Sequence, residues 1–229
     1  TRVMADNQDL FVEQTRMRNN RLEYLADGRW LPARARYETF LVRGQSAVRK
    51  VVYETRHGPL LNGVRSTAAP ATYQSRYGLA LQRPAWEGDK TLDAFFDISR
   101  ARAVDQALEA SHNVTAIALN MMFVDRENIA WQVTGRYPNR KAGVGLVPSP
   151  GWDGQYDWEG YADPMLFPYD INPVQGWLAT ANHRVASAGY GMQLSNSWMP
   201  PERIERIEQK LSVGQQSLAS TQQLQLDEH

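Results

Sequence analysis

The sequence predicts an α+β fold that is rich in β-strands. The first 55 residues contain several short segments in which apolar and polar side chains alternate, which is the period of a half-buried strand. Apolar side chains at helical spacing are confined to two regions, residues 91–110 and 201–211. With 229 residues, of which 42% are hydrophobic and 22% charged, the chain can form a sizeable core.

The first strands are expected near the start of the chain. Asp9–Glu13 is one, and Arg21–Leu25 is another, with a turn sequence at Ala26–Gly28. Two further strands are expected at Arg36–Val42 and Val48–Thr55. The pattern is typical of an antiparallel meander that exposes one face to solvent.

A helical region and a strand pair are expected next. Thr91 is a suitable cap for a first helix, and a second helix is expected within Ala101–Ala110. The continuous apolar run Ala116–Val124 predicts a strand buried on both faces. Ile129–Val133 is its expected hairpin partner.

The last third is more irregular. Residues 135–173 are rich in Gly, Pro, Tyr and Trp, and a long segment of this kind tends to be functional or to cover something. Gly176–Ala181 reads as a strand that ends at Asn182. A helix is expected over 201–211, whereas the Gln-rich residues 215–229 show weak amphipathicity and no feature that closes a domain.

Composition excludes several classes of function. Lys and Arg together number 25, as do Asp and Glu, so no strong field attracts nucleic acid or anionic lipid. No apolar run is long enough to cross a bilayer. The absence of cysteine rules out a thiolate metal site and a Cys nucleophile. A zinc hydrolase is also disfavoured, because no i, i+4 pair occurs among the four histidines, His57, His112, His183 and His229.

Seven short motifs occur in one order along the chain. They are Thr1–Phe11, Thr55–Pro59, Asp125–Trp131 with Thr134–Arg140, Pro150–Gly151 with Tyr156–Gly160, Asn172–Asn182, Pro200–Ile204 and Leu224–Asp227. Each motif is weak alone. Together, in this order and spacing, they resemble the penicillin acylase family of N-terminal-nucleophile hydrolases, and particularly its acyl-homoserine-lactone acylase branch.

The resemblance implies a fold, a reaction and a set of partners. The fold would be part of a four-layer α/β/β/α sandwich, with residues 1–229 as a single partial domain from the middle of the large (beta) chain. The missing alpha chain and the rest of the beta chain would be its partners. An N-terminal Ser upstream would attack the linear amide of a small-molecule acyl amide, such as an N-acyl homoserine lactone or a penicillin, with its own α-amine as base. The resemblance also implies a periplasmic zymogen without an organic cofactor.

Three residues match family positions at the reacting carbonyl. By resemblance, the side-chain amide of Asn182 and the backbone N–H of Arg2 hold the oxyanion of the tetrahedral intermediate. Arg203 matches an arginine that supports this asparagine and the substrate pocket.

The acidic segment near the start resembles a family calcium site. Asp6 and Asp9 would supply carboxylates, and Gln8 and Gly145 would supply backbone carbonyls. Oxygen ligands of this kind suit Ca²⁺. This chain departs from the family pattern in one respect. The region before Arg203 should supply a further carboxylate ligand, but no acidic residue lies between Asn182 and Glu202.

Other interpretations of the same residues stay open. The chain could be a non-catalytic, β-rich scaffold or binding unit, or a complete amidase that uses Thr1 as its nucleophile. Outside the family context, Asn182 would be a strand-end turn residue and Arg203 a solvated helix residue. Asp6 and Asp9 would then cap a turn, and His57 is expected to be a structural turn residue rather than a base.

Overall fold

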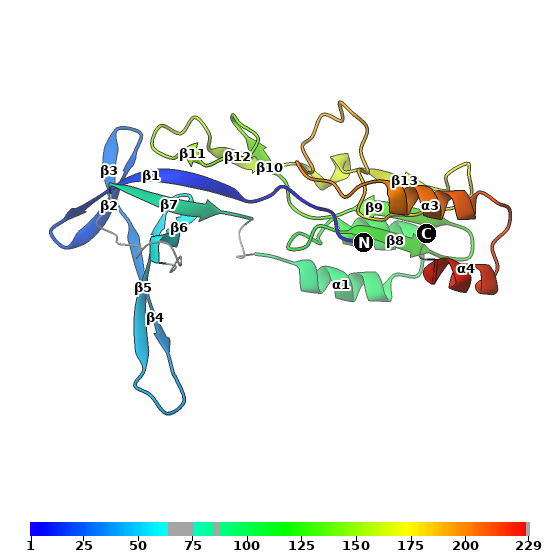
Figure 1. Ribbon diagram of the computed structural model, residues 1–229, viewed down its shortest axis with the longest axis horizontal. Coiled ribbons are helices and arrows are strands. Elements are labelled where there is room, and N and C mark those ends of the chain that lie inside the picture. The colour runs from blue at the N-terminus through cyan, green and yellow to red at the C-terminus, as the bar shows by residue number, and fades with distance from the viewer. Residues whose placement is uncertain (64–75, 85–87, 228–229) are drawn as a thin grey trace. The chain divides into compact units, whose positions relative to one another are not determined.

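The computed structural model describes residues 1–63, 76–84 and 88–227 of the chain. It divides into two compact units (Figure 1). The first unit contains Thr1–Asp6, Ala85–Tyr137 and Ala162–His229, and the second contains Asn7–Pro84 and Pro138–Tyr161. The single partial domain that the resemblance implies stays a prediction.

The second unit is built on strand β1 (Asp9–Arg18). It pairs antiparallel with β2 (Arg21–Ala26), which in turn pairs with β3 (Arg29–Pro32), so these strands form the expected meander. On its other side β1 pairs antiparallel with β7 (Tyr77–Gln82) and parallel with β11 (Ser149–Pro150). Buried and half-buried residues alternate along β1, which places Phe11 in the core together with Leu22, Leu60 and Ala80.

The remaining elements of the second unit are shorter. A three-stranded antiparallel sheet contains β4 (Arg34–Phe40), β5 (Val48–Thr55) and β6 (Gly58–Pro59). Strands β10 (Pro138–Arg140) and β12 (Trp158–Tyr161) pair antiparallel, and a 3₁₀ turn, η1, spans Leu61–Gly63.

The first unit contains one antiparallel sheet and the helices. The sheet has the order β13 (Tyr169–Ile171), β9 (Ile129–Val133) and β8 (Asn120–Val124). The helical elements are α1 (Thr91–Arg100), α2 (Val104–Ser111), η2 (Pro164–Leu166), α3 (Glu202–Leu211) and α4 (Leu218–Gln225). Its buried core consists of Val3, Ala118, Val133, Tyr137, Phe167 and Leu194. Within the described part of the chain, no helix is long and apolar enough to cross a membrane.

The structure confirms the β-rich α+β class and both predicted helical regions. The strand expected at Gly176–Ala181 is wrong. Gly176 has a φ of +77° and closes a turn on the carbonyl of Pro173 (2.8 Å), which breaks the extended backbone. The Gln-rich segment also contains a helix that was not expected, α4, and the side chain of Ser217 accepts from Ser220 N at its start.

The apolar run that ends at Val124 differs from the expectation as well. The strand begins only at Asn120, and it is not buried on both faces. Met122 is 45% exposed and Val124 is 75% exposed. A continuous apolar run indicates that both faces of a strand are suited to burial. It does not indicate which segments of the chain cover those faces.

Candidate functional site

The first three residues lie antiparallel beside the residues that lead into β8. Thr1 N donates to Asn120 O (3.0 Å), and Asn120 N donates to Thr1 O (2.6 Å). Val3 N donates to Ala118 O (3.0 Å). Because the backbone groups of successive residues point to opposite sides of a strand, the N–H and C=O of Arg2 point away from β8.

Asn182 lies on that outer side of Arg2. Its Nδ2 donates to the carbonyl oxygen of Arg2 (2.6 Å), although 180 residues separate the two along the chain. Asn182 has a φ of +63°, a left-handed conformation that asparagine adopts more readily than most residues. The carboxamide carries a second N–H, so Nδ2 can donate to a further oxygen near the Arg2 N–H.

Arg203, in the first turn of α3, fixes the orientation of this amide. Its Nη1 donates to Asn182 Oδ1 (3.3 Å). A guanidinium only donates, so the contact requires the amide oxygen of Asn182 to face Arg203 and the NH₂ group to face Arg2. The structure therefore brings together the three residues predicted at the reacting carbonyl, and their oxyanion role stays a prediction.

Two polar residues that sequence reasoning missed contact Thr1, the neighbour of Arg2. Thr180 Oγ1 lies 2.8 Å from Thr1 Oγ1, and Asn120 Nδ2 donates to the same hydroxyl (3.2 Å). Trp131 Nε1 donates to Asn120 Oδ1 (3.0 Å) and so orients that side chain. The nucleophilic role considered for Thr1 stays a prediction.

His183 follows Asn182 directly. Its Nδ1 accepts from the backbone N–H of Ala181 (3.4 Å). Burial lowers the pKa of His183 below its usual value, against a smaller opposing effect of the Glu208 carboxylate. Both the contact and the shift favour a neutral imidazole beside Asn182.

The residues predicted to bind calcium are divided between the two units. In the first unit, Asp6 Oδ2 accepts from the side-chain amides of Gln193 and Asn196, the latter at 2.5 Å. Asp6 N also donates to Leu194 O (2.9 Å). The amide groups of Gln193 and Asn196 come from the region where the family pattern has an acid, and amide oxygens are acceptable calcium ligands.

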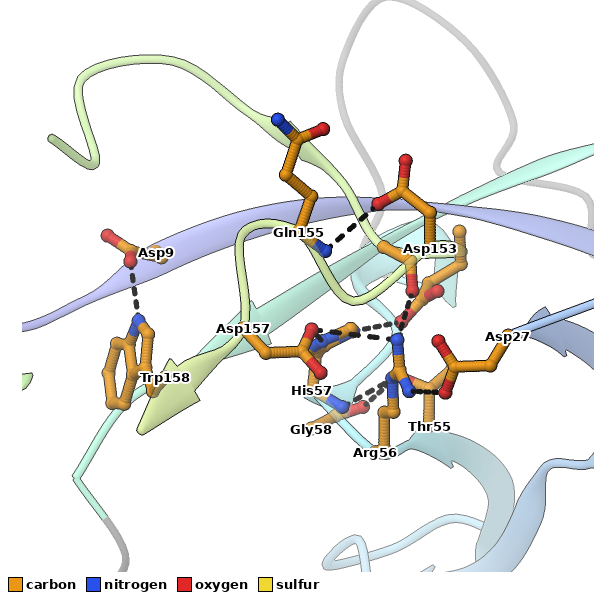
Figure 2. A network of polar contacts seen from close by, with 12 residues as sticks. Asp9, Asp27, Thr55, Arg56, His57, Gly58, Asp153, Gln155, Asp157 and Trp158 are labelled. Atoms are coloured by element: carbon orange, nitrogen blue, oxygen red, sulfur yellow. Dashed lines mark hydrogen bonds and ion pairs between the residues drawn. The ribbon is translucent and has the colours of Figure 1, made fainter. Parts of the chain in front are cut away.

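In the second unit, Asp9 is engaged by a cation. Arg140 binds both carboxylate oxygens, Nε to Oδ2 at 2.7 Å and Nη2 to Oδ1 at 2.9 Å. Trp158 Nε1 donates to Oδ2 (2.6 Å; Figure 2). Gly145 lies so close that a Cβ there would be 2.3 Å from Asp9 Oδ1. Gln8 is exposed just before β1.

Asp9 thus forms a buried ion pair that uses both carboxylate oxygens, so a calcium ion bound there would compete with the guanidinium. Among the described residues, no three His, Cys, Asp or Glu side chains form a cluster suited to a metal. The calcium site stays a prediction.

A buried network around His57 occupies the second unit (Figure 2). The ring nitrogens lie 2.8 Å from carboxylate oxygens on both sides, Nδ1 from Glu13 and Nε2 from Asp157. Thr55 Oγ1 also donates to Glu13 (2.7 Å), and the imidazole stacks on Phe11 at 3.9 Å between centroids. His57 joins β1, the β5–β6 turn and the loop before β12, as expected for a structural residue.

Arg56 extends the network toward the surface. Its Nη1 donates to Asp27 (2.7 Å), and its Nη2 donates to the carbonyl of Gly151 (3.0 Å). Sequence reasoning missed the carboxylates of this network. One signal was available for Glu13, which lies two residues after Phe11 and therefore on the same buried face of β1.

Comparison with known protein families gives a match over the whole chain. The family model described as penicillin amidase matches residues 1–229. The acyl-homoserine lactone acylase QuiP of Pseudomonas fluorescens is 58% identical over 226 residues, which cover 99% of this chain and 27% of that protein. The penicillin G acylase of Escherichia coli is 27% identical over 186 residues, 80% of this chain and 21% of that protein. The chain thus spans about a quarter of the length of the curated relatives it matches.

A solved structure has the same fold. It is the thermostable penicillin G acylase from Alcaligenes faecalis, which aligns with a TM-score of 0.77 at 23% sequence identity. The alignment covers 98% of this chain and 39% of that one.

Proposed function

The chain belongs to the penicillin amidase family, and we propose that the full-length protein hydrolyses linear amides between an acyl chain and an amine. The observation that carries the proposal is the contact of Asn182 with Arg2. A carboxamide that contacts the backbone of Arg2 supports a site in which Asn182 Nδ2 and Arg2 N both donate to one oxygen.

In the proposed mechanism this chain stabilises charge and another segment supplies the nucleophile. A Ser that begins the mature large chain attacks the amide carbonyl, and its α-amine takes the proton. The carbonyl oxygen becomes an oxyanion that accepts from Asn182 Nδ2 and Arg2 N. Arg203 keeps the amide in the donating orientation. One such donor is worth about 2.7–4 kcal/mol of transition-state stabilisation.

N-Acyl homoserine lactones are the proposed substrate class. The relatives at 54–58% identity are named acyl-homoserine lactone acylases, whereas those named penicillin acylases are 27–29% identical. The amide between a penicillin nucleus and its side chain is the second candidate, since it has the same acyl–amine connectivity.

Location and maturation are proposals that rest on the family alone. We propose that the protein is periplasmic and that self-cleavage releases the nucleophile from a precursor. Cell fractionation and N-terminal sequencing of the large chain test both. A cytoplasmic protein or an uncleaved active chain would contradict them.

The function is tested on the full-length protein. Purified protein is incubated with an N-acyl homoserine lactone, the released homoserine lactone amine is measured, and a serine-reactive amide-hydrolase probe locates the labelled residue. Release of amine with label on an upstream Ser is expected. Absence of turnover in a correctly processed protein would favour the scaffold interpretation instead.

The Thr1 alternative is tested in parallel with Thr1→Val, which removes the hydroxyl but keeps the shape of the side chain. The proposed mechanism predicts that this variant stays active and that the probe still labels the upstream Ser. Loss of labelling in Thr1→Val would instead make Thr1 the nucleophile.

A further inference from the structure

Strand β8 has one open edge in the first unit. The sheet order β13-β9-β8 leaves β8 with a single strand neighbour among the described residues. Met121 and Phe123 pair with β9 opposite Gln132 and Ala130. The N–H and C=O groups of successive residues in a strand point to alternate sides. After Asn120, the groups that point away from β9 therefore belong to Met122 and Val124.

The open edge lacks the features that protect exposed strands. Natural edge strands are short or bear charges or proline, whereas β8 reads Asn-Met-Met-Phe-Val. Met122 and Val124 are large apolar side chains with exposed fractions of 45% and 75%. Val124 also lines an open groove of about 760 Å³ with Leu108 of α2. An uncharged apolar edge of this kind is expected to be covered in the complete protein.

The chain itself indicates what covers the edge. Thr1 and Asn120 exchange two backbone hydrogen bonds, and Arg2 and Leu119 form an antiparallel bridge. Figure 1 shows the N-terminus beside β8. A backbone that continues back from Thr1 in the same extended conformation runs along β8 toward Val124.

We propose that the segment directly preceding Thr1 in the full-length protein is an antiparallel strand paired with β8. The inference rests on the proposed function in one respect, that the complete protein carries residues before Thr1. Each step back from Thr1 advances one residue along β8. The second and fourth residues before Thr1 therefore form hydrogen-bonded pairs with Met122 and Val124, and the third lies opposite Phe123.

The added strand has a consequence for the candidate site. Arg2 would be the end of a continuous strand rather than part of an isolated three-residue contact. Its N–H would then be held in register by ladder bonds on both sides of Thr1. A shift of the ladder by one residue would turn the Arg2 N–H toward β8 and away from Asn182.

Cysteine pairs in the full-length protein test the register. Facing residues in a non-hydrogen-bonded pair bring their Cβ atoms to about 4.5–5.5 Å, close enough for a disulfide after small adjustments. One variant combines a cysteine at the third residue before Thr1 with Phe123→Cys. The matched control combines the same cysteine with Met121→Cys, which is two residues out of register.

Mild oxidation followed by peptide mapping under reducing and non-reducing conditions gives the readout. The disulfide is expected with Phe123→Cys and not with the control. Cross-linking through Met121→Cys alone, equal cross-linking of both pairs, or none in either would overturn the inference.

Hydrogen exchange in the unmodified full-length protein gives an independent readout that needs no variant. The amides of Met122 and Val124 are expected to exchange as slowly as those of Met121 and Phe123. Fast exchange at the even positions with slow exchange at the odd ones would overturn the inference. Amide hydrolysis is assayed in the same preparation, so a protected edge in an inactive protein would count against the proposed function and not against the strand.

Discussion

Arg203 and Asn182 form a hydrogen bond in which the guanidinium Nη1 donates to the amide oxygen across 3.3 Å. The nitrogen of the same amide donates to the carbonyl of Arg2. The arginine therefore determines which end of the amide faces the segment Thr1–Val3. A change at Arg203 alters the direction of a proposed oxyanion donor without removing it.

Arg203→Met is expected to lower kcat of the full-length protein about tenfold and to change KM little. The reason is that a hydrogen bond to a charged group contributes about 1.5–3 kcal/mol and this pair is exposed, so the lower end applies. Steady-state kinetics with an N-acyl homoserine lactone check the split. The control is Arg206→Met on the same helix, whose arginine pairs with Asp227; it should change the melting temperature rather than kcat. Equal losses of kcat in both variants would contradict a role for Arg203 in positioning.

His183 predicts a dependence of stability on pH. Burial lowers its pKa in the folded state below the usual value of about 6.5, so the unfolded chain binds the proton more readily. The contribution of His183 to folding stability is therefore fully present above about pH 6.5. It is lost as the pH falls from about 6.5 through the lowered pKa of the folded state. The melting temperature of His183→Gln should fall less than that of the unmodified protein between about pH 7 and pH 5. Parallel falls would contradict the prediction.

The Asp9–Arg140 ion pair predicts a large loss of stability on removal of one partner. Both side chains are buried, with exposed fractions of 7% and 6%. Arg140→Met leaves a buried carboxylate without its cation, which costs about 3–5 kcal/mol in comparable cases. The exposed pair of Arg36 with Glu54 is the matched control, and Arg36→Met should cost at most about 1 kcal/mol. Denaturant unfolding measures both, and similar losses would argue against a structural role for Arg140.

Calcium is expected to have little effect on stability at low concentration. With Asp9 bound to Arg140, one of the two carboxylates of the predicted ligand set is already engaged by a cation. Sites with few charged ligands bind calcium weakly, at about 10⁻⁴–10⁻³ M. The melting temperature of the full-length protein should therefore be the same in micromolar calcium and in chelator. An increase in micromolar calcium that Asp9→Asn abolishes would make Asp9 a metal ligand.

The local elements of this fold were predictable from the sequence. Alternation identified β1 and β2, and apolar spacing identified α1 and α3, because both signals depend on neighbours within a few residues. The Gly176 turn was not identified, since its positive φ is independent of hydrophobic pattern. The uncovered face of β8 was also not identified, because burial depends on segments distant along the chain.

In the candidate site, too, the contacts between residues distant in sequence were not predictable from local pattern. The grouping of Asn182, Arg2 and Arg203 was predicted only through the resemblance, since 180 residues separate the first two and no periodicity links them. His57 was placed correctly as a turn residue, but its two carboxylate partners lie 44 and 100 residues away in sequence. Arg140, the cation that binds Asp9, is 131 residues away, so the acidic segment alone could not reveal this ion pair.

The side chain of Asn182 provides the most direct test of the central claim, that this chain supplies the oxyanion donors of an amidase. Asn182→Gly retains a residue that tolerates the φ of +63° and removes the donating amide. The matched control is Asn172→Gly, which also has a positive φ and loses side-chain bonds to Ile129 and Asn128.

The measurement is kcat of the full-length protein with an N-acyl homoserine lactone. Asn182→Gly is predicted to lower kcat by about 10²–10³-fold, while Asn172→Gly stays near the unmodified protein. Unchanged turnover in a folded, processed Asn182→Gly protein would contradict the account.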